Sequence, residues 1–123
     1  MTTARPTVLL CDDSRALRML AASQLEEAGF QVVGEAGNGN EALARYRELK
    51  PDLVLLDLVM PECDGRQALS NILAADPQAK VVILSSLGAQ SDIEECLRAG
   101  ARSYLQKPID PEVMERVLRE ALA

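Results

Sequence analysis

Short apolar segments alternate with segments of helical periodicity along the whole chain. Five runs rich in Val, Leu and Ile end at turn residues, which predicts β-strands rather than helices. The expected strands cover residues 7–11, 30–35, 53–57, 80–85 and 103–106. Elsewhere apolar side chains recur every three or four positions, which predicts helices over residues 14–28, 41–50, 66–75, 91–99 and 111–122.

The third run, Leu53 to Leu56, has no polar position, which is typical of a strand buried on both faces. In the run over residues 30–35, apolar and polar positions alternate more, so we expect this strand at an edge of the sheet. Strands that alternate with helices predict an α/β fold, with a parallel sheet covered on both faces. The common arrangement for five such units is a flavodoxin-like, doubly wound sheet with strand order 2-1-3-4-5 and five helices.

Composition narrows the class of protein. The 123 residues are 48% hydrophobic and 26% charged, as in a globular protein, and we expect a single domain over residues 1–123. The net charge of -6 argues against nucleic-acid binding, and the lack of histidine argues against a zinc site. No apolar run approaches membrane-spanning length, so we expect a cytoplasmic protein without membrane insertion. Cys11, Cys63 and Cys96 form no CxxC pattern, which predicts reduced thiols.

Polar residues stand at the ends of four expected strands. Asp12 and Asp13 follow the first strand, Asp57 ends the third, Ser85 ends the fourth and Lys107 follows the last. The carboxyl ends of parallel strands share one edge of the sheet, and ligands bind there at the switch point between strands 1 and 3. Each residue alone could instead cap a helix or lie on the surface, as Asp and Ser often do. Their convergence from four strand ends predicts a functional site.

Three carboxylates in one place favour a cation site, because they repel one another unless a positive charge lies among them. Oxygen ligands of this kind suit Mg2+, which keeps several waters in protein sites. Such an ion beside a lysine would gather phosphoryl oxygens, and a carboxylate can itself be the nucleophile that forms an aspartyl-phosphate. The sequence has no glycine-rich phosphate loop, so nucleotide binding is not expected.

The pattern of Asp12–Asp13, Asp57 followed by an MPECDG segment, Ser85 and Lys107–Pro108 resembles the receiver domain of two-component response regulators. The resemblance extends over essentially the whole chain and implies a CheY-like fold. By size the chain looks like a stand-alone receiver of the chemotaxis CheY type, and a receiver cut from a longer regulator is the alternative.

This resemblance implies a role for each residue of the cluster. Asp57 would accept a phosphoryl group from a histidine kinase or phosphotransfer protein, and Lys107 would contact the phosphoryl oxygens. Asp12, Asp13, Asp57 and the backbone carbonyl of Val59 would hold Mg2+. The Lys107–Pro108 peptide bond is expected to be cis, an isomer that is accessible because the second residue is proline.

The resemblance also implies a switch built from Ser85 and Tyr104. Phosphorylation would draw in the hydroxyl of Ser85, and the Tyr104 ring would follow. The face formed by the fourth helix, the fifth strand and the last helix would then change and regulate a downstream target protein. Such a protein is a phosphoacceptor with slow self-dephosphorylation and not a true enzyme. Ser86 and Ile109 replace the alanine and phenylalanine frequent in the family, which leaves partner choice open.

Two other functions share parts of the pattern. An aspartate-nucleophile phosphatase would need a second carboxylate two residues after Asp57, where this chain has Val59. A flavodoxin would need a phosphate loop after the first strand and aromatic residues around the flavin, whereas the chain has one Phe, two Tyr and no Trp. Val59 and Leu87 are apolar and are expected to flank the path of a hydrolytic water, which predicts a long-lived phosphorylated state unless they only pack the loop edges.

Overall fold

The computed structural model describes residues 5–60, 64–86 and 90–123. Its five strands are β1 (Thr7–Cys11), β2 (Gln31–Ala36), β3 (Leu53–Asp57), β4 (Val81–Ser85) and β5 (Ser103–Gln106). They form one sheet in the order β2-β1-β3-β4-β5, and all neighbouring pairs are parallel. The predicted flavodoxin-like order is therefore confirmed, with β2 at an edge.

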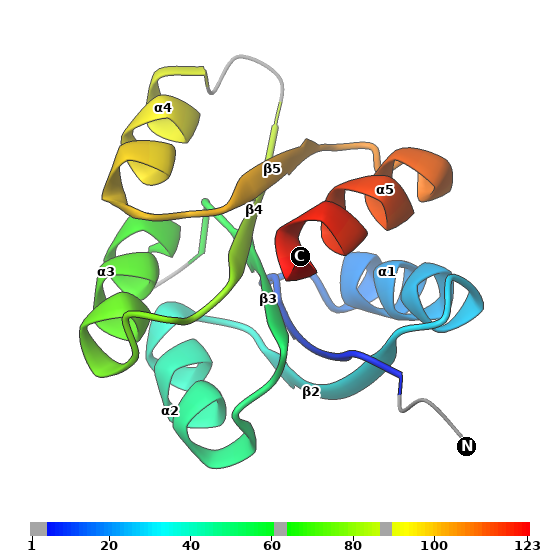
Figure 1. Cartoon of the computed structure of the whole chain (residues 1–123), viewed down its shortest axis with the longest axis horizontal. Coiled ribbons are helices and arrows are strands. Elements are labelled where there is room, and N and C mark those ends of the chain that lie inside the picture. Colours follow the sequence, from blue (N-terminus) through cyan, green and yellow to red (C-terminus); the bar gives the residue numbers. More distant parts are fainter. Residues whose placement is uncertain (1–4, 61–63, 87–89) are drawn as a thin grey trace.

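Five helices cover both faces of this sheet (Figure 1). They are α1 (Arg15–Glu27), α2 (Gly39–Leu49), α3 (Gly65–Ala75), α4 (Gln90–Ala99) and α5 (Pro111–Leu122). Helices α1 and α5 lie on one face, and α2, α3 and α4 lie on the other. This three-layer arrangement leaves the carboxyl edge of the sheet accessible between the two layers of helices.

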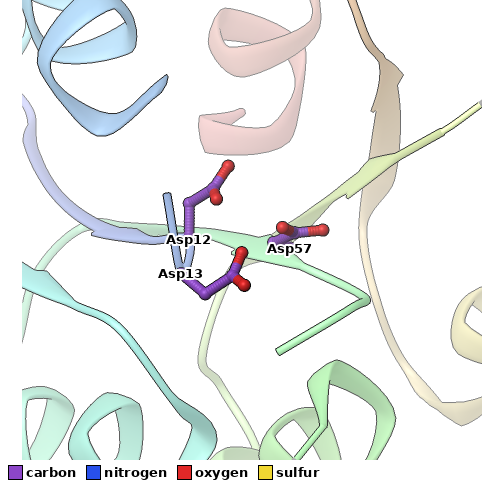
Figure 2. A group of neighbouring side chains, drawn as sticks. All are labelled: Asp12, Asp13 and Asp57. Atoms are coloured by element: carbon purple, nitrogen blue, oxygen red, sulfur yellow. The ribbon is translucent and has the colours of Figure 1, made fainter. Parts of the chain in front are cut away.

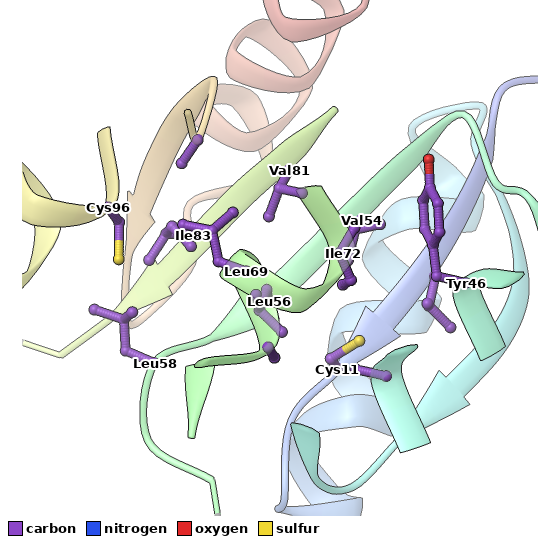
Figure 3. Close-up of a cluster of buried hydrophobic side chains, with 14 of the residues drawn as sticks. Cys11, Tyr46, Val54, Leu56, Leu58, Leu69, Ile72, Val81, Ile83 and Cys96 are labelled. Carbon is purple, nitrogen blue, oxygen red and sulfur yellow. The ribbon is translucent and has the colours of Figure 1, made fainter. Parts of the chain in front are cut away.

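The core consists of two apolar clusters, one on each face of the sheet. Strands β3 and β4 are buried along their whole length, which explains why their sequences carry no polar face. Val54 and Leu56 pack toward α2, α3 and α4, whereas Leu53 and Leu55 pack toward α1 and α5. Figure 3 shows the cluster on the face covered by α2, α3 and α4, in which side chains of β3 and β4 pack against Leu69 and Ile72 of α3. The central strands are thus held from both sides, and so are the residues at their ends.

Polar side chains cap the amino ends of four helices. Ser14, Asn38, Asp64 and Asp110 each accept a hydrogen bond from a backbone N–H of the first turn. The bounds predicted for α2, residues 41–50, were wrong at both ends. Asn38 caps the helix, which therefore begins at Gly39, two residues before the predicted start. The helix stops at Leu49, and the following Lys50 has a left-handed backbone with φ 45.

Strand β2 begins one residue later than predicted and pairs irregularly with β1. Val8 lies opposite Val32, but Leu9 lies opposite Gly34, so the register shifts between Val8 and Leu9. Val33 is the extra residue of this bulge. The strand ends at Ala36, one residue later than predicted.

Gly65 lets α3 begin directly against the end of β3. The sequence pattern placed Gly65 in the loop, but it is the first residue of the helix, and its N–H donates to the carbonyl of Leu58 at 3.0 Å. A Cβ atom at this position would lie 2.3 Å from the carbonyl oxygen of Asp57. Glycine is therefore required for this close approach, which supports the backbone that carries Asp57.

Two remaining expectations concern thiols and membranes. Cys11 and Cys96 are free, in agreement with the prediction of reduced thiols, and both are buried. Cys63 lies outside the described residues, as do Pro61, Glu62 and Leu87. In the ranges that the structure describes, none of the helices is both long and apolar enough to cross a membrane.

Candidate functional site

The structure brings the predicted strand-end residues together at the carboxyl edge of the sheet. Asp12 and Asp13 follow β1, Asp57 is the last residue of β3, Ser85 is the last residue of β4, and Lys107 follows β5. Neighbouring strands are paired up to their ends, with Cys11 opposite Leu56 and Ser85 opposite Gln106. Because neighbouring strands end within one residue of each other, these polar groups share one small region.

Three carboxylates form the centre of this region (Figure 2). One oxygen from each of Asp12, Asp13 and Asp57 lies within 4.8 Å of the others. Asp12 is 2% exposed and Asp57 is 4% exposed, while Asp13 is exposed. Three closely spaced carboxylates, two of them buried, are unfavourable unless cations compensate their charge, so this acidic group could hold a metal ion.

Lys107 supplies one of the compensating charges. Its Nζ donates to Asp12 Oδ2 at 3.0 Å and to Asp57 Oδ2 at 3.1 Å. Burial acts to lower the pKa of Lys107, but the hydrogen bonds to both carboxylates outweigh it, and the pKa is raised. The lysine therefore stays protonated and bridges the ends of β1 and β3.

Backbone groups hold the two buried carboxylates in place. Asp12 Oδ1 accepts a hydrogen bond from the N–H of Ser14 at 2.9 Å, and Asp57 Oδ1 accepts one from the N–H of Val59 at 3.2 Å. Burial raises the pKa of Asp57, although the hydrogen bonds from Val59 and Lys107 act in the opposite direction. The anionic form of Asp57 is thus stabilised by two donors in a site that otherwise disfavours its charge.

Ser85 has a buried hydroxyl that lacks a partner. The residue is 1% exposed, and its Oγ makes no hydrogen bond within the described part of the chain. A buried hydroxyl without a partner is costly, by about 1–3 kcal/mol. At the rim of an acidic site, such a group is suited to binding an oxygen atom that arrives with a ligand.

Two further expectations have a structural counterpart. The Lys107–Pro108 peptide bond is cis, as the family resemblance implied. Tyr104 lies in β5 opposite Ile83, with 46% of its surface exposed. Because strand side chains alternate and Leu105 packs toward α5, the ring of Tyr104 faces the side of the sheet that α4 covers.

Sequence reasoning missed one residue that touches the site. Arg18, in the second turn of α1, donates a hydrogen bond to the backbone carbonyl of Asp12 and another to Glu35. In the sequence Arg18 looks like an ordinary surface position of an amphipathic helix. The available signal was its place four residues after the cap Ser14, since long side chains on a helix point back toward the amino end.

Comparison with known proteins agrees with this geometry. The family model "Response regulator receiver domain" matches residues 8–119. The chain is similar to the chemotaxis protein CheY of Thermotoga maritima, with 40% identity over 92% of this chain and 94% of the relative. It is 37% identical to the chemotaxis protein CheY of Bacillus subtilis over 94% of this chain and 96% of the relative.

Solved structures give the same result. The structure is similar to a CheX–CheY–BeF3–Mg complex from Borrelia burgdorferi, with a TM-score of 0.90, 31% identity and coverage of 95% of this chain and 89% of that chain. It is also similar to the response regulator domain of Thermotoga maritima CheB, with a TM-score of 0.84, 34% identity and coverage of 97% and 98%. The family match, the relatives and the shared strand order together show that this chain belongs to the response regulator receiver domain family.

Proposed function

We propose that this protein is a phosphorylation-activated signalling switch of a two-component phosphorelay of the chemotaxis type, with Asp57 as the phosphoacceptor. The observation that carries the proposal is the position of Asp57: a carboxylate at the end of a buried strand, 4% exposed, bonded to Lys107 and grouped with two other carboxylates. A carboxylate in such a site can act as a nucleophile.

The donor set fits Mg2+. Three carboxylates offer closely spaced oxygen ligands, and the open side next to exposed Asp13 leaves room for the waters that Mg2+ retains. Asp12, Asp13 and Asp57 would hold the ion, with the backbone carbonyl of Val59 as a further ligand. When bound, Mg2+ would neutralise the charge of the phosphoryl oxygens, and the ammonium group of Lys107 would add a second positive charge at the site.

The transfer step uses a phosphohistidine on a histidine kinase or phosphotransfer protein. An oxygen of Asp57 attacks the phosphorus, the O–P bond forms and the P–N bond breaks. The electron pair of that bond stays on the imidazole nitrogen, which takes up a proton from solvent. Lys107, already within hydrogen-bond distance of Asp57, needs little movement to contact the incoming phosphoryl oxygens.

Ser85 and Tyr104 are the proposed switch residues. A phosphoryl oxygen on Asp57 would give the buried Ser85 hydroxyl the acceptor that it lacks, and Tyr104 would fill the space that this movement leaves. The face formed by α4, β5 and α5 exposes one large apolar side chain from each element, namely Leu97, Tyr104 and Val113. These side chains offer apolar contacts for a downstream target protein, and their arrangement would depend on the state of the switch.

The phosphodonor must reach Asp57, so it has to cover the surface next to the site. A cavity of about 350 Å³ lies there, lined by Asp12, Leu17, Leu20, Lys107 and Ile109 among others. Leu17 and Leu20 are exposed side chains of α1. We place the kinase or phosphotransfer protein on this groove, and we assign no nucleic-acid or membrane partner to a protein that would act in the cytoplasm.

The same residues favour a switch over an enzyme. A phosphatase that uses an aspartate nucleophile needs a general acid close to it, and the position two residues after Asp57 is Val59, whose apolar side chain is 72% exposed. Without such a group the phosphoaspartate would hydrolyse slowly, which suits a state that has to persist while a target is bound.

Incubation with acetyl phosphate and Mg2+ tests the proposal. We expect intact-protein mass spectrometry to show one added phosphoryl group that hydroxylamine removes. Asp57→Asn keeps the shape but removes the nucleophile, so it should abolish the addition. An undiminished mass shift in Asp57→Asn would contradict the assignment, and Asp52→Asn, which alters an exposed aspartate at the other edge of the sheet, is the matched control.

A further inference from the structure

Arg18 binds the backbone of the acidic site from outside it. Its side chain is 18% exposed and turns back over the first turn of α1. Nη1 donates a short hydrogen bond to the carbonyl oxygen of Asp12, and Nε donates to Glu35 Oε1 at 3.0 Å. One guanidinium therefore joins three segments of the chain: α1, the β1–α1 connection and the end of β2.

The Asp12 carbonyl belongs to the peptide group that joins Asp12 to Asp13. Asp12 itself is held at its other polar groups, since its N–H donates to Ala36 and its carboxylate accepts from Ser14 and Lys107. Asp13 is different, because it is exposed and its carboxylate accepts no hydrogen bond from any residue that the structure describes. The direction of the Asp13 side chain is therefore set by the orientation of the peptide that Arg18 holds.

We infer that Arg18 is a positioning residue for the Mg2+ site, an inference that rests on the proposed function. Its bond to the Asp12 carbonyl fixes the Asp12–Asp13 peptide against β2, and its bond to Glu35 fixes the plane of the guanidinium. Asp13 is thereby kept close to Asp12 and Asp57, with the three ligand oxygens within 4.8 Å of one another. Arg18 contributes no ligand of its own.

This role predicts an effect whose sign is opposite to that of simple electrostatics. A positive charge near a cation site repels the cation, so loss of Arg18 would strengthen Mg2+ binding if only charge mattered. If Arg18 orients Asp13, its loss weakens Mg2+ binding. Groups that orient metal ligands typically change metal affinity by about 10–100-fold when they are removed.

Isothermal titration calorimetry of the unphosphorylated protein with Mg2+, at constant ionic strength, shows whether the loss of Arg18 weakens or strengthens Mg2+ binding. Arg18→Met should bind Mg2+ about tenfold more weakly. Arg18→Lys keeps the charge but makes a single contact in place of two, so its affinity should lie between those of Arg18→Met and the wild type. Arg15→Met is the matched control, because Arg15 is an exposed arginine of the same helix that makes no hydrogen bond to the β1–α1 connection in the described structure. This control should bind Mg2+ as tightly as the wild type or slightly more tightly.

Equal or tighter Mg2+ binding by a folded Arg18→Met protein would overturn the inference. If that variant does not fold, Glu35→Met removes the hydrogen-bond acceptor of Arg18 Nε at an exposed position, and an unchanged Mg2+ affinity in that variant overturns the inference equally. A wild-type protein that binds no Mg2+ overturns both this inference and the metal part of the proposed function. If the wild type binds Mg2+ and is phosphorylated but Arg18→Met binds Mg2+ with the same affinity, only this inference is overturned and the proposed function stands.

Discussion

Replacing Lys107 with methionine should destabilise the Mg2+-free protein and make its stability strongly dependent on Mg2+. The lysine ammonium lies 3.0 Å from Asp12 and 3.1 Å from Asp57. Both carboxylate side chains are almost completely buried, at 3% and 6% exposure, while Lys107 is 21% exposed. Methionine retains most of the volume of the stem but leaves two buried carboxylates next to each other without the shared cation.

The size of the effect follows from these contacts. Two opposite unit charges at ~3 Å attract by about 5 kcal/mol for an effective dielectric constant of about 20, and desolvation offsets most of this. Removing one partner of a buried ion pair costs about 3–5 kcal/mol. Because Lys107 is partly exposed, we expect a loss of about 2–3 kcal/mol, or a decrease in Tm of roughly 6–15 °C for a domain of this size.

Lowering the pH should partly restore the stability of Lys107→Met. Burial already raises the pKa of Asp57, and loss of Lys107 removes an influence that lowers it, so the pKa should rise further. When a carboxyl group has a higher pKa in the folded than in the unfolded state, its protonation stabilises the folded protein. This stabilisation is complete at a pH below the unfolded pKa and is lost as the pH rises through the folded pKa. Lowering the pH from about 7 to about 5 should therefore narrow the difference between Lys107→Met and the wild type.

Thermal unfolding followed by circular dichroism, with and without Mg2+, measures these effects. Mg2+ should raise the Tm of Lys107→Met more than that of the wild type, because the ion replaces the missing positive charge. Lys80→Met is the control, since Lys80 donates to the backbone carbonyl of Leu122 and lies away from the acidic site. A Lys107→Met protein with the wild-type Tm, or with the same response to Mg2+, would refute the compensating role of Lys107.

Three other changes test separate parts of the site. Asp13→Asn should weaken Mg2+ binding in calorimetry yet raise the Tm of the Mg2+-free protein, because it removes one of three mutually repelling carboxylates; an unchanged Mg2+ affinity would contradict the proposed ligand set. Ser85→Ala should raise stability by about 1 kcal/mol, since it removes a buried hydroxyl that has no partner in the described ranges. The same variant should accept a phosphoryl group but lose most of the gain in target affinity, a coupling of typically ~5–150-fold, and a full gain would mean that another element carries the signal. Val59→Asn combined with Leu87→Glu should speed dephosphorylation about tenfold, ~1.4 kcal/mol of barrier, by orienting a water, and decay at the wild-type rate after donor removal would exclude this role.

The sequence predicted the site because its residues stand at strand ends. Once the buried runs are recognised as parallel strands, Asp57, Ser85 and Lys107 must share one edge of the sheet, and the order of the strands places Asp12 beside Asp57. Each strand end is a local property of a few residues, and the convergence follows from the topology alone. This explains why the structure brings Asp12, Asp13, Asp57 and Lys107 close together even though they lie far apart in the chain.

Other features depend on three-dimensional contacts that no local pattern records. The bulge at Val33 arises from the irregular pairing of β2 with β1. Helix α2 starts earlier than predicted because Asn38 caps its amino end. Arg18 reaches the site only because α1 lies across the end of β1, and the need for glycine at position 65 depends on how closely α3 approaches Asp57. That the Ser85 hydroxyl has no partner among the described residues likewise becomes evident only when its surroundings are known.

Chemical trapping of the phosphorylated residue tests the central claim most directly. Borohydride reduces an aspartyl-phosphate to homoserine, so protein treated with acetyl phosphate and Mg2+, reduced and digested can be mapped by peptide mass spectrometry. We expect homoserine at position 57, dependent on both the phosphodonor and Mg2+. Homoserine at Asp12 or Asp13 instead, or phosphate retained on a serine or threonine, would contradict it.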